Sequence, residues 1–170
     1  MFWPIYKSKI VLSKEQRDIY IHFVLASYPS LKDYKSQNFK IPPHTFGDFL
    51  YENFEKEVAS FCTPTYRQNN VKDCWAYVTS FGKPISYWHH HLRSSTINGV
   101  YYLKVNEKDK GIQFRYKDNI LHLQPAVNDL LIFPSWLEHY PFPSEDENIR
   151  ISINMEMLCE QSANELFAIK

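Results

Sequence analysis

The stretch YWHHHLRSSTINGVYYL, residues 87–103, places three consecutive histidines directly before a run rich in β-branched and aromatic residues. That run, STINGVYYLKV at residues 95–105, predicts a strand. Side chains alternate between the two faces of a strand, so extended backbone here projects His89 and His91 to one side and His90 to the other. Two imidazoles on one face can bind one metal ion, and a third ligand must then come from another part of the chain.

Five more runs of the same character indicate a fold that is mainly β. They are DCWAYVTSF (73–81), GIQFRYK (111–117), ILHLQ (120–124), DLLIFP (129–134) and NIRISINMEM (148–157). Turn residues separate them, and many short strands at this spacing are typical of a sandwich or barrel. Alternating strand and helix units are absent, which argues against a parallel Rossmann-type sheet.

Two helices are expected before the strands. Ser13 and Gln16 form the pattern of a capping box at the start of a helix over residues 13–28, and Thr45 with Asp48 opens a second helix. We expect both to be packing elements without chemistry of their own. Their predicted apolar faces are Ile19, Phe23 and Val24 for the first, and Phe46, Phe49, Leu50, Phe54, Val58 and Phe61 for the second.

The length of 170 residues is typical of one domain. We expect a single domain over residues 1–170, with a helical N-terminal part at 1–70, a β core at 71–157 and a C-terminal tail at 158–170. The 19 basic residues equal the 19 acidic ones, so the chain lacks the positive surface that nucleic-acid binding needs, and no nucleic-acid partner is expected. Residues 83–118 carry more basic residues than acidic ones, the acids being Glu107, Asp109 and Asp118. This excess could attract a small anion, but we interpret the stretch as a solvated loop face.

The cysteines, Cys62, Cys74 and Cys159, show no metal-ligand spacing, which favours reduced thiols in a cytoplasmic compartment. The N-terminus lacks the pattern of a secretory signal, and no apolar run approaches the length of a membrane span. We therefore expect a cytoplasmic protein with no membrane association. The oligomeric state is left open.

His139 is the best candidate for the third ligand. It lies in FPSWLEHYPFP, residues 133–143, where proline and aromatic residues predict a rigid turn just after an apolar strand. Iron bound by three protein ligands on one face keeps three positions open for a bidentate cosubstrate and oxygen.

Arg150 is an unusual residue in the middle of a β run. Inside a barrel it would be a buried charge that needs an anionic partner, and guanidinium pairs well with a carboxylate. Ser152 lies on the same strand face, and Tyr102 can point into the same barrel. The alternative is an edge strand on which Arg150 forms a surface salt bridge.

Taken in order, these elements resemble the iron(II)/2-oxoglutarate-dependent oxygenases related to prolyl hydroxylases, over about residues 71–157. The matching elements are His89-x-His91, Gly99 to Leu103, Gly111 to Phe114, Pro125 to Ser135, His139, and Arg150-Ile151-Ser152. The resemblance implies a double-stranded β-helix, or jelly roll, with the N-terminal helices packed on one sheet. Members of this family occur in bacteria and bacteriophages, so a phage-encoded protein in the host cytoplasm is one possibility.

The resemblance also implies a reaction and its site. Fe(II) would be held by His89, His91 and His139, and the distal carboxylate of 2-oxoglutarate would bind Arg150, Tyr102 and Ser152. With O2 as the second cosubstrate, 2-oxoglutarate would be decarboxylated to succinate and CO2 while a C–H bond of the substrate is hydroxylated.

The sequence departs from the family pattern in two respects. The usual carboxylate ligand appears as His91, and no Asp or Glu occurs between residues 86 and 106. The gap from this histidine to the GVYYL strand is one residue longer, which a β-bulge near Ser94 and Ser95 would absorb. The alternative is that His90, rather than His89 or His91, is a ligand.

Two other functions stay open. One is a cupin-like metal enzyme with three histidine ligands that does not use 2-oxoglutarate. The other is a non-catalytic jelly-roll module for binding or assembly. The substrate, a small molecule or a peptide, is not specified, and the candidate substrate contacts are Tyr77, Tyr87, Trp88, Arg93 and Trp136.

Overall fold

The computed structural model describes residues 2–27, 38–79, 87–143 and 149–170. The elements in chain order are β1 (Tyr6–Lys9), α1 (Lys14–Ser27), β2 (Asn38–Lys40), α2 (Phe46–Ala59), β3 (Cys74–Thr79), β4 (Ile97–Lys104), β5 (Ile112–Tyr116), β6 (Asn119–Leu123), β7 (Asp129–Pro134), β8 (Glu138–Pro141), β9 (Arg150–Met157) and α3 (Ala163–Leu166). Tyr28, Ser80, Phe81 and Asn148, which the sequence-based elements included, lie outside the described residues. No helix in the described ranges is long and apolar enough to cross a membrane.

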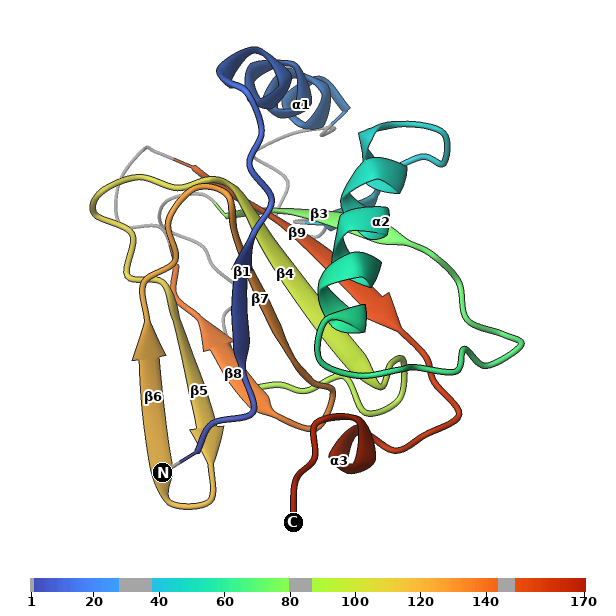
Figure 1. Cartoon of the computed structure of the whole chain (residues 1–170). Helices are drawn as coiled ribbons and strands as arrows, with labels where there is room; N and C mark the ends of the chain where they lie inside the picture. The colour runs from blue at the N-terminus through green and yellow to red at the C-terminus, as the bar shows by residue number, and fades with distance from the viewer. Residues whose placement is uncertain (1, 28–37, 80–86, 144–148) are drawn as a thin grey trace.

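The strands form two antiparallel sheets. The larger has the order β1-β7-β4-β9-β3-β2, and the smaller has the order β6-β5-β8. The helices α1 and α2 lie against the larger sheet, away from β5 and β6 (Figure 1), where α1 contacts β4 and α2 contacts β3. The predicted class, mainly β with the N-terminal helices packed on one sheet, is confirmed.

Alternation along the central strands produces two apolar layers. Tyr101 and Leu103 of β4 join the core beneath the helices, whereas Tyr102 packs with a second cluster that includes Phe114 of β5 and Phe133 of β7. Successive side chains of a strand point to opposite faces, so β4 contributes to both layers. The large sheet is thus covered by helices on one face and by the small sheet on the other.

Two of the predicted helical core positions are wrong. The capping box itself is confirmed, because Gln16 N and Ser13 N each hydrogen-bond to the other residue's side chain. Ile19, however, is 58% exposed and Phe49 is 40% exposed. The spacing of apolar residues predicts that a helix forms, but it does not determine which residues at the edge of the apolar face are buried.

Three strands were not predicted. β1 and β2 come from the part expected to be helical, and they form the two edges of the large sheet, where short half-buried strands give a weak sequence pattern. β8 replaces the turn expected around His139. The bulge expected near Ser94 and Ser95 is instead a hydrogen-bonded turn, in which both backbone N–H groups donate to His91 O at 3.0 and 3.1 Å.

The contact between α2 and β4 predicts the effect of Gly99→Ala. A Cβ at Gly99 would lie 2.7 Å from the Cδ2 and Cε2 atoms of Phe54, a fully buried ring that has no room to retreat. We expect a loss of about 1–3 kcal/mol in the free energy of unfolding, measured by urea denaturation. The penalty should shrink in a Phe54→Leu background, as residues in contact are coupled. A Gly99→Ala protein as stable as the wild type would contradict the described packing of α2.

Candidate active site

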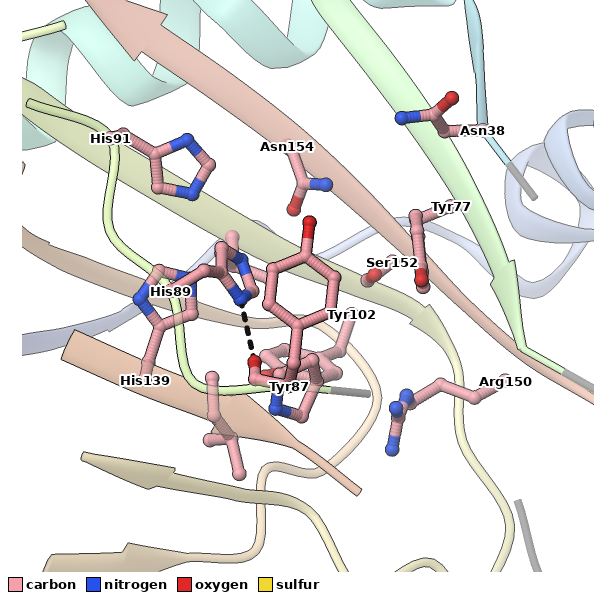
Figure 2. A pocket seen from close by; sticks show the side chains of 13 residues that line it. Asn38, Tyr77, Tyr87, His89, His91, Tyr102, His139, Arg150, Ser152 and Asn154 are labelled. Atoms are coloured by element: carbon pink, nitrogen blue, oxygen red, sulfur yellow. Dashed lines mark hydrogen bonds between the residues drawn. The ribbon is translucent and has the colours of Figure 1, made fainter. Parts of the chain in front are cut away.

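A cavity of about 320 Å³ opens between the inner face of the large sheet and the strand β8. Eight of the residues singled out from the sequence line it: Tyr77, Tyr87, His89, His91, Tyr102, His139, Arg150 and Ser152. Figure 2 shows the three histidines gathered at one side of this cavity and Arg150 at the other, with Tyr102 between them. The cavity therefore has an imidazole end and a guanidinium end.

The histidine cluster consists of His89, His91 and His139. Each can offer one ligand atom, and these atoms lie within 4.8 Å of one another. The ring centroids of His89 and His139 are 4.1 Å apart, because the two backbones exchange hydrogen bonds of 3.1 and 2.9 Å as antiparallel partners. His91 N donates to Ser135 O at 2.8 Å, which fixes the third histidine on the same side.

Hydrogen bonds at Nδ1 set the orientation of all three rings. Nδ1 of His89 lies 2.9 Å from Tyr87 O, that of His139 lies 3.1 Å from Leu137 O, and that of His91 lies 2.7 Å from Glu156 Oε1. Carbonyl and carboxylate oxygens can only accept, so each Nδ1 carries a proton, and in the neutral ring Nε2 then has the lone pair that a metal can bind. Metal-binding histidines typically have this arrangement.

Burial favours the neutral form of two of the three histidines. It lowers the pKa of His139 well below its usual value, and the neighbouring His89 and His91 lower it further. Burial also lowers the pKa of His89. Neutral imidazoles are the form that binds metals.

His90 lies apart from the cluster. Its side chain is exposed, and its Nδ1 accepts a 3.4 Å hydrogen bond from Leu92 N. Of the two assignments that the sequence left open, the structure brings His89 and His91 together with His139 and leaves His90 outside.

Arg150 has the anionic partner that its position requires. It is 2% exposed on β9, between β4 and β3, so the edge-strand alternative is wrong. Nη1 donates to Asp109 Oδ1 at 2.8 Å, and Nη2 donates to Phe142 O and, at 3.5 Å, to Thr79 Oγ1. The interpretation of Asp109 as part of a solvated loop face is also wrong, because this carboxylate is 7% exposed.

The Asp109 loop is built to hold this carboxylate inward. Asp109 Oδ1 also accepts from Gly111 N at 2.7 Å, and Gly111 has a φ of 74°, which glycine adopts without strain. Asp109 Oδ2 is buried without a hydrogen-bond partner among the described residues. Burying this ion pair, with one carboxylate oxygen left without a hydrogen bond, costs desolvation free energy, and the pair lies next to the cavity.

Tyr102 and Ser152 lie on neighbouring strands beside Arg150. They are direct partners in the register of β4 and β9, and both line the cavity, where the Tyr102 hydroxyl points toward Asn154 (Figure 2). Burial raises the pKa of Tyr102, which keeps its phenol protonated and able to donate. The cavity thus offers the O–H donors of Tyr102 and Ser152 in addition to the N–H donors of Arg150.

The candidate substrate contacts divide into two groups. Tyr77 and Tyr87 line the cavity. Trp88 instead stacks against Arg115, whose Cζ is 4.7 Å from the ring centroid, and Trp136 packs on Tyr116 at 5.1 Å. Arg93 is exposed in the turn before β4. Of the two tyrosines, Tyr87 lies beside the histidine cluster, with its ring centroid 5.2 Å from that of His89, whereas Tyr77 lies on the side of Ser152 and Arg150 (Figure 2).

Four polar residues at the site were not identified from the sequence: Asn38, Asp109, Asn154 and Glu156. Asn38 and Asn154 line the cavity, and the two carboxylates contact Arg150 and His91. Asn154 and Glu156 follow Arg150 and Ser152 at intervals of two, so extending the strand alternation would have found both. Asp109 carries no such signal, since its loop has no period.

Comparisons with known proteins agree on the fold. No protein-family model matches the sequence, and no curated protein matches it. Among solved structures, a Pseudomonas putida prolyl-4-hydroxylase aligns with a TM-score of 0.66 at 13% identity, covering 94% of each chain. A viral collagen prolyl hydroxylase from Paramecium Bursaria Chlorella virus-1 aligns with a TM-score of 0.68 at 15% identity, covering 92% of this chain and 90% of that one.

The same fold recurs in more distant enzymes. The carbocyclase SnoK from nogalamycin biosynthesis, described as non-heme and α-ketoglutarate-dependent, aligns with a TM-score of 0.62 at 9% identity over 91% of this chain and 80% of that chain. Identities this low establish the fold alone. The chain therefore has the double-stranded β-helix fold of prolyl 4-hydroxylases and other 2-oxoglutarate-dependent oxygenases, as the resemblance seen in the sequence implied.

Proposed function

We propose that the protein is an Fe(II)/2-oxoglutarate-dependent oxygenase that hydroxylates a C–H bond of its substrate. The observation that carries the proposal is the pairing, within one cavity of this fold, of three converging histidines with a buried arginine. One of the structures that this chain resembles, the viral collagen prolyl hydroxylase, is a complex with 2OG, that is, 2-oxoglutarate.

The histidine cluster fits the metal. His89, His91 and His139 would hold Fe(II) through their Nε2 atoms, and imidazole is a suitable ligand for iron as well as for zinc, copper and nickel. Bound iron would supply the oxygen activation, with 2-oxoglutarate as the electron donor. The chain's own part is to present three neutral imidazoles from one side and to shield that side from water.

The guanidinium end fits the distal carboxylate of 2-oxoglutarate. Arg150 uses one N–H on Asp109 and up to two on Phe142 O and Thr79 Oγ1, and a guanidinium has five. The remaining N–H groups, with the hydroxyls of Tyr102 and Ser152, would donate to the carboxylate. This half of the site would set the orientation of the cosubstrate relative to the histidines.

One observation favours a second candidate, a three-histidine metal enzyme that does not use 2-oxoglutarate. Asp109 already neutralises Arg150, so the arginine has a partner without any cosubstrate. The two candidates differ in whether 2-oxoglutarate binds at all.

The first test is the visible metal-to-ligand charge-transfer band that forms when 2-oxoglutarate chelates Fe(II). We expect the band on anaerobic addition of both to the wild type, its loss in His139→Ala and Arg150→Ala, and its retention in His90→Ala. The exposed His90 is the matched control within the same histidine run. A folded wild type that binds iron but gives no band would favour the second candidate, and one that binds no metal would favour a non-catalytic module.

The Asp109–Arg150 pair predicts a large stability effect. Asp109→Ala leaves a buried guanidinium uncompensated and should cost about 3–5 kcal/mol in urea denaturation. Removing both charges in Asp109→Ala/Arg150→Met should recover most of the lost free energy of unfolding. Lys40→Ala, which breaks an ion pair with Asp73 in which both side chains are partly exposed, should cost at most about 1 kcal/mol.

The same variants also test the cosubstrate site. If 2-oxoglutarate binds at Arg150, it should raise the melting temperature of Asp109→Ala and leave that of the double variant unchanged. Equal stabilisation of both proteins would mean that the cosubstrate binds elsewhere.

The lowered pKa of His139 predicts a pH dependence of the metal-free protein. The unfolded chain binds a proton at a pKa of about 6.5, whereas the folded chain resists protonation until lower pH. The stabilising contribution of the neutral imidazole is thus complete above about pH 6.5 and is lost as the pH falls toward the folded-state pKa. Urea denaturation with a chelator present should show stability falling between pH 7 and pH 5.5. The fall should be shallower in His139→Gln and unchanged in His22→Gln, a substitution at an exposed helical histidine.

A further inference from the structure

We propose that Glu156 is a positioning residue that supplies, through His91, the negative charge that the three histidines do not bring to the metal. The inference rests on the proposed metal site and extends it to a residue outside the ligand set. It concerns the tuning of the metal by a carboxylate that does not touch it.

Glu156 is held directly behind His91. Its Oε1 lies 2.7 Å from His91 Nδ1 and also accepts a 3.1 Å hydrogen bond from Ser94 Oγ. The backbone of the same residue is fixed from the helix side, because Tyr51 Oη donates to Glu156 O at 2.8 Å. The carboxylate is therefore anchored by the sheet, by α2 and by the turn after His91.

His91 differs from the other two histidines in its Nδ1 acceptor. His89 and His139 each donate to the backbone carbonyl two residues earlier, Tyr87 O and Leu137 O. His91 donates to a charged oxygen at a shorter distance. A charge-assisted hydrogen bond of this kind draws the Nδ1 proton toward the carboxylate and makes Nε2 a stronger donor to a metal.

Among the described residues, Glu156 is the carboxylate near the histidines that is not paired with an arginine, so it can offset the positive charge of a metal ion. Three neutral imidazoles add no charge to a divalent cation, and a cation in a partly buried site requires compensation. Asp109 is paired with Arg150 at 2.8 Å, and Glu138 is paired with Arg115 at 2.8 Å. The carboxylate that contacts a histidine of the cluster is Glu156.

The geometry separates this role from direct ligation. The side chains that can place ligand atoms within 4.8 Å of one another are His89, His91 and His139, without Glu156, among the residues that the structure describes. Glu156 also lies on the Nδ1 side of the His91 ring, whereas the metal would bind Nε2.

The test is metal affinity, measured without 2-oxoglutarate. Fe(II) or Co(II) would be titrated anaerobically against a chromophoric chelator with the wild type, Glu156→Gln and Glu156→Ala. We expect both variants to bind the metal more weakly, with dissociation constants about 10–100-fold larger than that of the wild type. Glu160→Gln, which removes the same charge at an exposed position four residues away, should stay within about twofold of the wild type.

The reduction potential of bound iron separates a charge effect from a structural one. Glu156→Gln keeps the size of the side chain and a hydrogen-bond acceptor, and it removes the charge that favours Fe(III). The potential should therefore shift to more positive values in Glu156→Gln and stay constant in Glu160→Gln.

Four outcomes would overturn this inference, the proposed function, or both. Wild-type affinity and potential in both folded Glu156 variants would show that the carboxylate does not tune the metal. Complete loss of metal binding in Glu156→Ala, as expected for His91→Ala, would make Glu156 a ligand instead. A wild type that binds no metal would overturn this inference and the proposed function together. Metal binding that depends on Glu156 while 2-oxoglutarate gives no charge-transfer band would overturn the proposed function alone.

Discussion

The two-faced pattern of β9 is the constraint on which the rest of the structure depends. This strand lies between β4 and β3 in the large sheet, and its apolar side chains, Ile151, Ile153, Met155 and Met157, are fully buried in the core beneath the helices. The alternation of side chains then directs Arg150, Ser152, Asn154 and Glu156 to the opposite face. A shift of one residue in register would bury four polar groups under the helices, so the packing that stabilises the fold also aligns the polar side of the cavity.

The histidine cluster depends on a second pairing, between the segment before β4 and β8. The backbone exchange between His89 and His139 brings two histidines together that are far apart in the sequence, and Ser135 O fixes His91 beside them. The Nδ1 atoms of His89 and His139 are then occupied by the carbonyls of Tyr87 and Leu137, and that of His91 by Glu156 of β9. The arrangement of the three histidines is therefore set by hydrogen bonds within the fold, which is the preorganisation that a metal site would require.

The parts of the protein that could be predicted are those that follow from the alternation of side chains along a strand or from the residue types of a segment. Six strands follow from β-branched and aromatic runs, and Arg150 and Ser152 follow from alternation along one of them. The same alternation, applied to the extended segment before β4, selects His89 and His91. The edge strands β1 and β2 were missed because a short half-buried strand lacks a clear pattern. Asp109 was misplaced because only the folded chain brings its loop over Arg150, 41 residues away in the sequence. Glu156 lies on the same face of β9 as Arg150 and Ser152, so alternation extended along the whole strand does place it beside the cavity.

The charges of the cavity bear on the kind of cosubstrate that it can accept. Asp109 balances Arg150, and Glu156 contacts His91, so the described residues at the two ends contribute one buried cation and two carboxylates. A divalent metal ion at the histidines would leave the cavity with an excess of one positive charge. Such a cavity favours an anionic partner over a neutral one, and donors at the arginine end with a cation at the histidine end match a molecule that is charged at both of its ends. 2-Oxoglutarate is a molecule of this kind, so the paired state of Arg150 and the absence of a ligating carboxylate among the described residues are both compatible with its binding.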